Sequence, residues 1–164
     1  MIIDIPGYKK LQITTLLLDY NGTIAEDGII RPAVKERLQK LSKELSIYVL
    51  TADTHGTARA QCEGLDLKVH TFPVGSAMDA KRAVLDEIGG ERCACMGNGR
   101  NDVRMFENAA LSIGIIDREG AYSGLLKTAD LCVNSTEDGL DLLLYPKRLI
   151  AGVRGLNRRV TMGL

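Results

Sequence analysis

Six short apolar segments recur along the chain, separated by polar stretches with helical spacing. The segments are rich in Val, Ile, Leu or Cys and cover residues 13–19, 45–51, 68–72, 92–96, 111–116 and 130–133. Several are apolar without interruption, as expected for strands that are covered on both faces. The pattern therefore predicts a sheet buried between two layers of helices.

The stretches between these segments predict amphipathic helices. Val34, Leu38, Leu41 and Leu45 repeat at four, three and four residues, and Pro32 stands where a first helical turn tolerates it. Further helices are predicted over 54–63, 77–88, 101–109, 136–143 and 146–156. Strands alternating with helices over short connections are typical of a parallel sheet. We expect an α/β fold, a three-layer α/β/α sandwich with a mainly parallel, Rossmann-like sheet.

Length and charge narrow the class of protein. The 164 residues suit one domain spanning 1–164, and 21 basic and 21 acidic side chains give a formal net charge of zero. No general field attracts polyanions, so we expect no nucleic-acid partner. No apolar run reaches about 18 residues, and MIIDIPGYKK lacks the basic start and apolar stretch of a signal peptide. We therefore expect a cytoplasmic protein without membrane contact.

Two further features are interpreted as structural. The cysteines form no CxxC pair and are interpreted as small buried side chains in a reducing compartment; they are Cys62, Cys93, Cys95 and Cys132. The segment 146–164 is basic, with no acidic residue. We expect it to form a helix packed on the domain or at an interface, with partner binding as the alternative.

Polar residues follow several predicted strands at the point where each strand ends. Asp19 ends the first strand before Tyr20–Thr23, Thr51 ends the second, and the fourth runs into Gly97–Asp102. Lys81 stands near the start of the third main helix. In open parallel sheets, ligands bind outside the carboxyl ends of the strands. We therefore expect these side chains to meet in one crevice.

These groups together suit phosphoryl transfer to a carboxylate. Asp19 would attack phosphorus and form an aspartyl phosphate. Thr51 and Lys81 would hold the nonbridging oxygens, and Mg²⁺ between Asp19 and the loop 98–102 would offset charge repulsion. Taken alone, each of these residues also fits a structural role, as a turn residue, a helix cap or a solvated cation.

The four motifs in this order resemble those of the haloacid dehalogenase-like superfamily of phosphatases and phosphotransferases. The resemblance extends over about residues 13–143. It looks closest to the phosphorylation domain of P-type cation ATPases, because GNGRNDVRMFENAALSIGI is similar to their GDGxND segment and the apolar strand behind it. The chain lacks the transmembrane helices and further domains of a pump, so it resembles a freestanding, capless relative.

The resemblance implies roles for particular residues and for a metal. Catalytic roles fall to Asp19, Asn21, Thr51 and Lys81. Phosphate binding falls to Gly22, Thr23, Thr51, Ala52, Lys81 and Asn101. The residues implied as Mg²⁺ ligands are Asp19, Asn21, Asn98 and Asp102.

Two positions depart from the superfamily pattern. Asn21 stands where its phosphatases carry a general acid and base, a loss that typically costs about 10²- to 10⁴-fold in rate. Asn98 stands where they carry a metal-binding Asp, so we expect weaker metal affinity. The sequence therefore predicts a slow Mg²⁺-dependent phosphohydrolase with a persistent phosphoenzyme.

Two alternative functions are open. The amides at 21 and 98 also suit a noncatalytic phosphate- or nucleotide-binding regulator or partner subunit with the same fold. A phospho-accepting receiver domain shares an Asp, a Thr and a Lys in the same order. A receiver needs an acidic pair after its first strand, however, and this chain has the single Asp19 there.

The spacing of the motifs leaves no room for a cap domain. About eight residues separate Thr23 from Pro32, enough for a small flap, and 29 residues (52–80) separate Thr51 from Lys81. An open site requires specificity from a neighbouring subunit or from a large substrate. We therefore expect a phosphorylated substrate and a homo-oligomer that covers the site.

Overall fold

The computed structural model describes residues 1–52 and 56–155, and its centre is one parallel sheet. The strands of this sheet are β3 (Thr15–Asp19), β6 (Ser46–Thr51), β7 (Lys68–Thr71), β8 (Cys93–Gly97), β9 (Leu111–Ile115) and β10 (Leu131–Val133). They lie side by side in the order β10-β9-β8-β3-β6-β7, and every pairing is parallel. All six predicted strands are confirmed, with ends within two residues of those expected.

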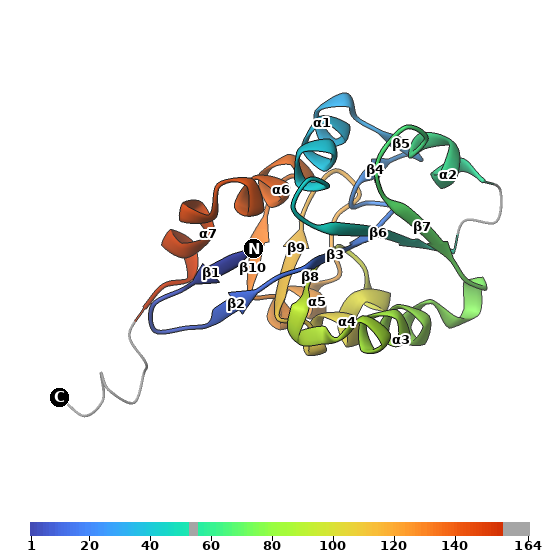
Figure 1. Ribbon diagram of the computed structural model, residues 1–164. Helices are drawn as coiled ribbons and strands as arrows, with labels where there is room; N and C mark the ends of the chain where they lie inside the picture. The colour runs from blue at the N-terminus through green and yellow to red at the C-terminus, as the bar shows by residue number, and fades with distance from the viewer. Residues whose placement is uncertain (53–55, 156–164) are drawn as a thin grey trace.

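Helices cover both faces of the sheet, as Figure 1 shows. One face carries α1 (Pro32–Leu41), α2 (Thr57–Gln61), α6 (Thr136–Leu144) and α7 (Pro146–Val153), and the other carries α3 (Ala77–Ile88), α4 (Val103–Asn108) and α5 (Ser123–Thr128). Successive side chains of a strand point to opposite faces. Leu16 and Leu18 of β3 therefore pack in the core under α1, while Leu17 packs in the core over α3. The predicted three-layer sandwich is confirmed.

The helix predictions hold with local differences. The helix expected over 54–63 is shorter in the described part, as α2, and residues 53–55 lie outside the described residues. The stretch 101–109 begins as a 3-10 turn (Arg100–Asp102) before α4. The helix α5 was not predicted. Of the basic segment 146–164, α7 is described, and residues 156–164 lie outside the described part.

Two small antiparallel hairpins are added to this core. The first pairs β1 (Ile2–Asp4) with β2 (Lys10–Gln12), and it was not predicted. The second pairs β4 (Ala25–Glu26) with β5 (Ile29–Ile30) and forms the small flap expected after Thr23. Within the described residues there is no separate cap domain, and no described helix is long and apolar enough to cross a membrane.

The order of the strands fixes where a ligand can bind. The strand β3 lies between β6 and β8, so the chain leaves β3 toward one edge of the sheet and later returns on its other side. At such a switch point, the connections leave a crevice outside the carboxyl ends of the two central strands. Asp19 is the last residue of β3 and Gly97 the last of β8.

Candidate active site

A buried lysine joins two carboxylates at the carboxyl end of β3. The Nζ atom of Lys81 donates to Asp19 Oδ1 at 2.8 Å, to Asp102 Oδ1 at 2.8 Å and to Asn101 Oδ1 at 3.0 Å. The three N–H donors of the ammonium are thereby all committed. Lys81 is 1% exposed and Asp102 is 0% exposed, whereas Asp19 is 8% exposed. Asp19 is therefore the carboxylate of this pair that lies nearer to solvent.

Burial and charge act in opposite directions on these groups. Burial lowers the pKa of Lys81, but Asp19 and Asp102 outweigh it, so the pKa lies above its ordinary value and the ammonium stays charged. Burial raises the pKa of Asp102, the charge of Asp19 raises it further, and it reaches about 7 in spite of Lys81. One cation is thus shared between two carboxylates.

The loop after β3 is built around a close approach of two motifs. Gly22 has φ +77°, and a Cβ at this position would lie 2.1 Å from Asn98 Nδ2. Glycine is required here both by the backbone angle and by the space that Asn98 occupies. The hydroxyl of Thr23 lies 3.3 Å from Asp19 Oδ2 and 3.4 Å from Asn98 Oδ1. The first and fourth motifs therefore form one surface.

Asn98 is held by the loop that follows β9. The side-chain Nδ2 of Asn98 donates to the carbonyl oxygen of Gly120 at 3.0 Å. The backbone carbonyl oxygen of Asn98 accepts from the backbone N–H of Tyr122 at 2.8 Å. The side-chain amide is therefore oriented with its nitrogen toward Gly120 and its oxygen toward Thr23 and the site.

An open cavity of about 220 Å³ lies in front of these residues. It is lined by Asp19, Asn21, Thr51, Ala52, Phe72, Ala77, Lys81, Asn98, Gly99 and Asn101. The structure thus brings together most of the side chains singled out in the sequence. Asp102 is different, because it lies behind Lys81 with Oδ1 bound to the ammonium and Oδ2 accepting from the N–H of Gly99 at 3.1 Å.

Two curated proteins of Methanocaldococcus jannaschii are similar to the chain in sequence. The uncharacterized protein MJ0073 is 38% identical over 92 residues, which are 54% of this chain and 99% of that protein. The uncharacterized protein MJ0072 is 59% identical over 39 residues, which are 24% of this chain and 89% of that protein. The chain belongs to the family of MJ0073. No protein-family model matches the sequence.

Solved structures identify the fold of this MJ0073 relative. The 3-deoxy-D-manno-octulosonate 8-phosphate phosphatase of Yersinia pestis aligns with a TM-score of 0.67 at 16% identity, over 95% of this chain and 98% of that one. The Moraxella catarrhalis enzyme, solved with magnesium, phosphate and KDO, gives 0.67 at 13% identity over 81% and 86%. The cobalt-bound Haemophilus influenzae enzyme gives 0.65 at 13% identity over 81% and 88%. These likenesses confirm the fold predicted from the sequence over most of the chain.

The donor atoms at the cavity suit a magnesium ion of modest affinity. Mg²⁺ takes hard oxygen ligands and usually needs one or two carboxylates besides water and substrate oxygens. Asp19 supplies one carboxylate to the cavity and Asn98 an amide oxygen, whereas both oxygens of Asp102 already have partners. Among the described residues, no group of three or more His, Cys, Asp or Glu side chains is placed to hold a metal. The residues present fit a divalent ion that completes its coordination with oxygens of water or of a ligand.

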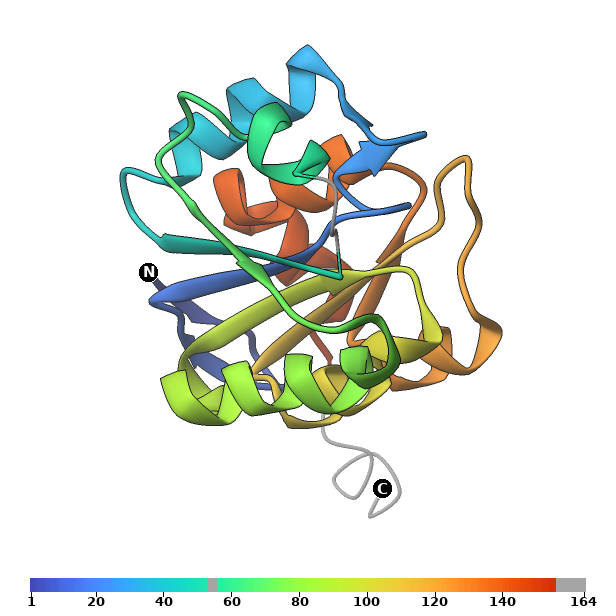
Figure 2. The same ribbon diagram turned by 90° about the vertical axis from the view of Figure 1, so that its right-hand side faces the viewer.

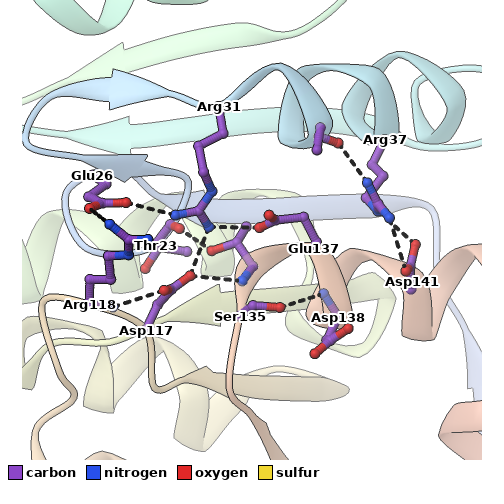
Figure 3. A network of polar contacts seen from close by, with 12 residues as sticks. Thr23, Glu26, Arg31, Arg37, Asp117, Arg118, Ser135, Glu137, Asp138 and Asp141 are labelled. Atoms are coloured by element: carbon purple, nitrogen blue, oxygen red, sulfur yellow. Dashed lines mark hydrogen bonds and ion pairs between the residues drawn. The ribbon is translucent and has the colours of Figure 1, made fainter.

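An ion-pair network beside the site was not predicted from the sequence, and Figure 3 shows it. Arg31, just before α1, binds Glu26 of the flap at 2.9 Å, Asp117 at 2.8 Å and Glu137 of α6 at 2.7 Å. Arg118 binds the other oxygen of Glu26 at 3.2 Å. The network therefore ties the flap to the loop after β9, which lies beside it in Figure 2.

The same region supports the loop of the first motif. The hydroxyl of Thr136, a fully buried residue at the start of α6, donates to the carbonyl oxygen of Thr23. The N–H of Thr136 donates to Asp117 at 3.3 Å. The contact between Thr136 and Thr23 joins segments 113 residues apart in the sequence, so periodicity and motif spacing give no signal for it.

Proposed function

We propose that the chain is a divalent-metal-dependent phosphohydrolase in which Asp19 is the nucleophile and carries the phosphoryl group. The observation that supports this most strongly is the pairing of Asp19 with Lys81 at 2.8 Å in the wall of an open cavity. A carboxylate that is positioned by a fixed cation and still lines an open cavity is the arrangement that nucleophilic catalysis requires.

The two oxygens of Asp19 have different surroundings. Oδ1 accepts the ammonium of Lys81, while Oδ2 has the longer 3.3 Å contact from the hydroxyl of Thr23. We propose that Oδ2 attacks phosphorus, because its lone pairs are less strongly engaged. The positive charge of Lys81 and the hydroxyl of Thr51 then stabilise the nonbridging phosphate oxygens, and Asn101 and the backbone around Gly22 and Ala52 complete the phosphate site.

A bound magnesium ion would offset the negative charge that Asp19 and the phosphate bring together. Asp19, Asn98 and the backbone carbonyl of Asn21 are the groups proposed to face it. Asp102, predicted as a further ligand, is proposed to contribute its negative charge from behind Lys81. With an amide at 98 in place of a carboxylate, we expect weak metal binding in the absence of substrate.

Asn21 sets the expected rate of the second step of the reaction, in which water hydrolyses the aspartyl phosphate. Its side chain lines the cavity but cannot take a proton from water, so hydrolysis of the aspartyl phosphate proceeds without a positioned base. We therefore propose slow turnover and a phosphoenzyme that persists. We expect Asn21→Asp to accelerate the release of phosphate.

The proposal is tested by phosphate release from acetyl phosphate, with magnesium and with a chelator. Turnover should require the metal and should disappear in Asp19→Asn, while the matched control Asp79→Asn, an exposed change on α3, should leave it unchanged. Metal-independent turnover, or turnover that survives Asp19→Asn, would contradict the proposal.

The pair of amides at 21 and 98 favours a second candidate, a noncatalytic phosphate- or nucleotide-binding regulator. This candidate predicts binding of inorganic phosphate to the wild type without any turnover or phosphoenzyme. Turnover that is abolished by Asp19→Ala would exclude it.

The open site also supports the proposal of a homo-oligomer. Ile29 of the flap is 61% exposed, and Tyr122 on the neighbouring loop is 44% exposed. Contiguous exposed apolar surface is typical of an interface, and these two side chains are the ones proposed to contact a second copy. Light scattering at micromolar concentration should show more than one copy, and Ile29→Glu should reduce the mass to that of a monomer. A monomeric wild type would remove this proposal.

A further inference from the structure

The described wall of the cavity lacks a side chain that can protonate a leaving group. Its ionisable side chains are Asp19, the proposed nucleophile, and Lys81, whose three N–H donors are already bound to protein oxygens. Asn21 occupies the position two residues beyond Asp19, and its amide N–H is not an acid in water. Thr51 offers only an alcohol. The first chemical step therefore has no general acid among these residues.

This property divides phosphorylated compounds by their leaving groups. Phosphoryl transfer has a loose transition state in which negative charge builds up on the departing oxygen. An alkoxide is about as basic as hydroxide, with a pKa of about 16 for its conjugate acid, so it departs slowly unless it is protonated. A carboxylate has a conjugate acid with a pKa of about 4 and departs as the anion.

We propose that the site selects acyl phosphates and discriminates against alkyl phosphate esters. This inference rests on the proposed function of Asp19 and specifies its substrate class. An Asp19 oxygen forms a bond to phosphorus, the bond from phosphorus to the acyl oxygen breaks, and its electron pair leaves with the carboxylate, so no proton is transferred. Water then attacks phosphorus, Asp19 is regenerated as a carboxylate, and the proton released from water passes to solvent.

The charge of the cavity favours the same class. Apart from Lys81, the described lining contains no cation, and Ala52, Phe72 and Ala77 give it an apolar part. A leaving group with several negative charges, such as a nucleoside diphosphate, would have no protein cation to balance it there. A small organic carboxylate carries one charge and presents an apolar body to these side chains.

The test compares kcat/KM for acetyl phosphate, p-nitrophenyl phosphate, phenyl phosphate and glycerol phosphate, all with magnesium. This parameter reports formation of the phosphoenzyme, since departure of the leaving group completes that step. In the wild type, kcat/KM should fall steeply in that order as the leaving group becomes more basic. Asn21→Asp should raise kcat/KM for glycerol phosphate by about 10²- to 10⁴-fold, and for acetyl phosphate by less than about tenfold.

The control variant is Asn108→Asp, the same chemical change at the exposed last residue of α4, which is not among the residues that line the cavity. It should leave the dependence on the leaving group as it is in the wild type. Asn21 is itself exposed, so an aspartate there does not place a new charge in the core. The wild-type series alone tests the inference if the variant does not fold.

The outcomes separate this inference from the proposed function. If glycerol phosphate reacts within about tenfold of acetyl phosphate, the inference is overturned while Asp19 retains its role. Preference for pyrophosphate over acetyl phosphate would overturn the substrate class. If no compound phosphorylates the protein, the proposed function itself fails.

Discussion

Replacing Lys81 by methionine should destabilise the protein strongly at neutral and alkaline pH. The ammonium makes two buried ion pairs of 2.8 Å. When the side-chain atoms alone are counted, the exposed fraction is 2% for Lys81, 12% for Asp19 and 0% for Asp102. Removal of one partner from a buried pair typically costs about 3–5 kcal/mol, because a charge remains buried without compensation. We expect a loss in this range although two ion pairs are broken. Asp102 can take up a proton, which limits the cost of breaking its pair with Lys81.

The loss should depend on pH in a defined direction. The pKa of Asp102 in the folded protein is about 7, above its ordinary value of 3.8, so the folded state binds this proton more tightly than the unfolded state. Loss of Lys81 removes the nearest attraction for the ionised form and raises this pKa further. As the pH falls toward about 7, Asp102 in the variant takes up its proton before Asp102 in the wild type does, and this relieves the repulsion from Asp19. The difference in stability between Lys81→Met and wild type should therefore become smaller as the pH falls.

The assay is urea unfolding followed by circular dichroism at several pH values, with unchanged slopes as evidence that the folded state is comparable. The double variant Lys81→Met/Asp102→Asn should recover most of the loss, because it removes the charge left unpaired. Arg82→Met, the adjacent residue with an exposed i,i+4 ion pair, should cost less than about 1 kcal/mol. A loss below about 1 kcal/mol for Lys81→Met, or one that is independent of pH, would refute the reasoning.

Three further predictions concern the surroundings of the site. Arg31→Ala leaves Asp117 and Glu137 without the cation that pairs with them, while Glu26 keeps Arg118, and should cost about 1–3 kcal/mol in the free energy of unfolding, less at high salt, as urea titrations at two ionic strengths would measure; an effect that does not change with salt would contradict the electrostatic explanation. Gly22→Ala combines φ +77° with a Cβ 2.1 Å from Asn98 and should lower stability by more than about 1 kcal/mol and reduce phosphoenzyme formation, which thermal unfolding and intact mass would test. Burial raises the pKa of Cys62 and of Cys93 from 9.0 to about 11, so at pH 8 the thiolate fraction falls about 100-fold and iodoacetamide should label these thiols in unfolded protein far faster than in folded protein, whereas equal rates would refute this.

The central sheet could be predicted because each strand carries its own local signal. Segments such as LLL before Asp19 are apolar on both faces, and only a strand covered by two helix layers buries them fully. The hairpin β1–β2 has a weaker signal, with Ile3 and Leu11 buried in alternating strands of three residues. The turn at Pro6 and Gly7 between these strands is the feature that would have indicated it.

The candidate site could be predicted as a set of residues but not as a set of distances. The strand ends and Gly22 identify which side chains meet, because parallel strands end at one edge of the sheet. The depth of Asp102 depends on how α3 packs against the 3-10 turn, which places Lys81 between this carboxylate and the cavity. The ion pairs of Arg31 with residues 86 and 106 positions away likewise arise from tertiary packing that no local pattern encodes.

The relation to the phosphorylation domain of P-type ATPases, the cytoplasmic location and the magnesium dependence stay predictions. The metal dependence is measured in the same experiment that detects a phosphoenzyme.

Formation of a phosphoenzyme on Asp19 tests the central claim most directly. The protein is incubated with acetyl phosphate and magnesium, quenched in acid and measured as intact mass, and the modified peptide is then located. We predict one phosphate on Asp19 that persists long enough to be isolated, is absent in Asp19→Asn and disappears faster in Asn21→Asp. No adduct in the wild type with any divalent metal, or an adduct on another residue, would contradict the account.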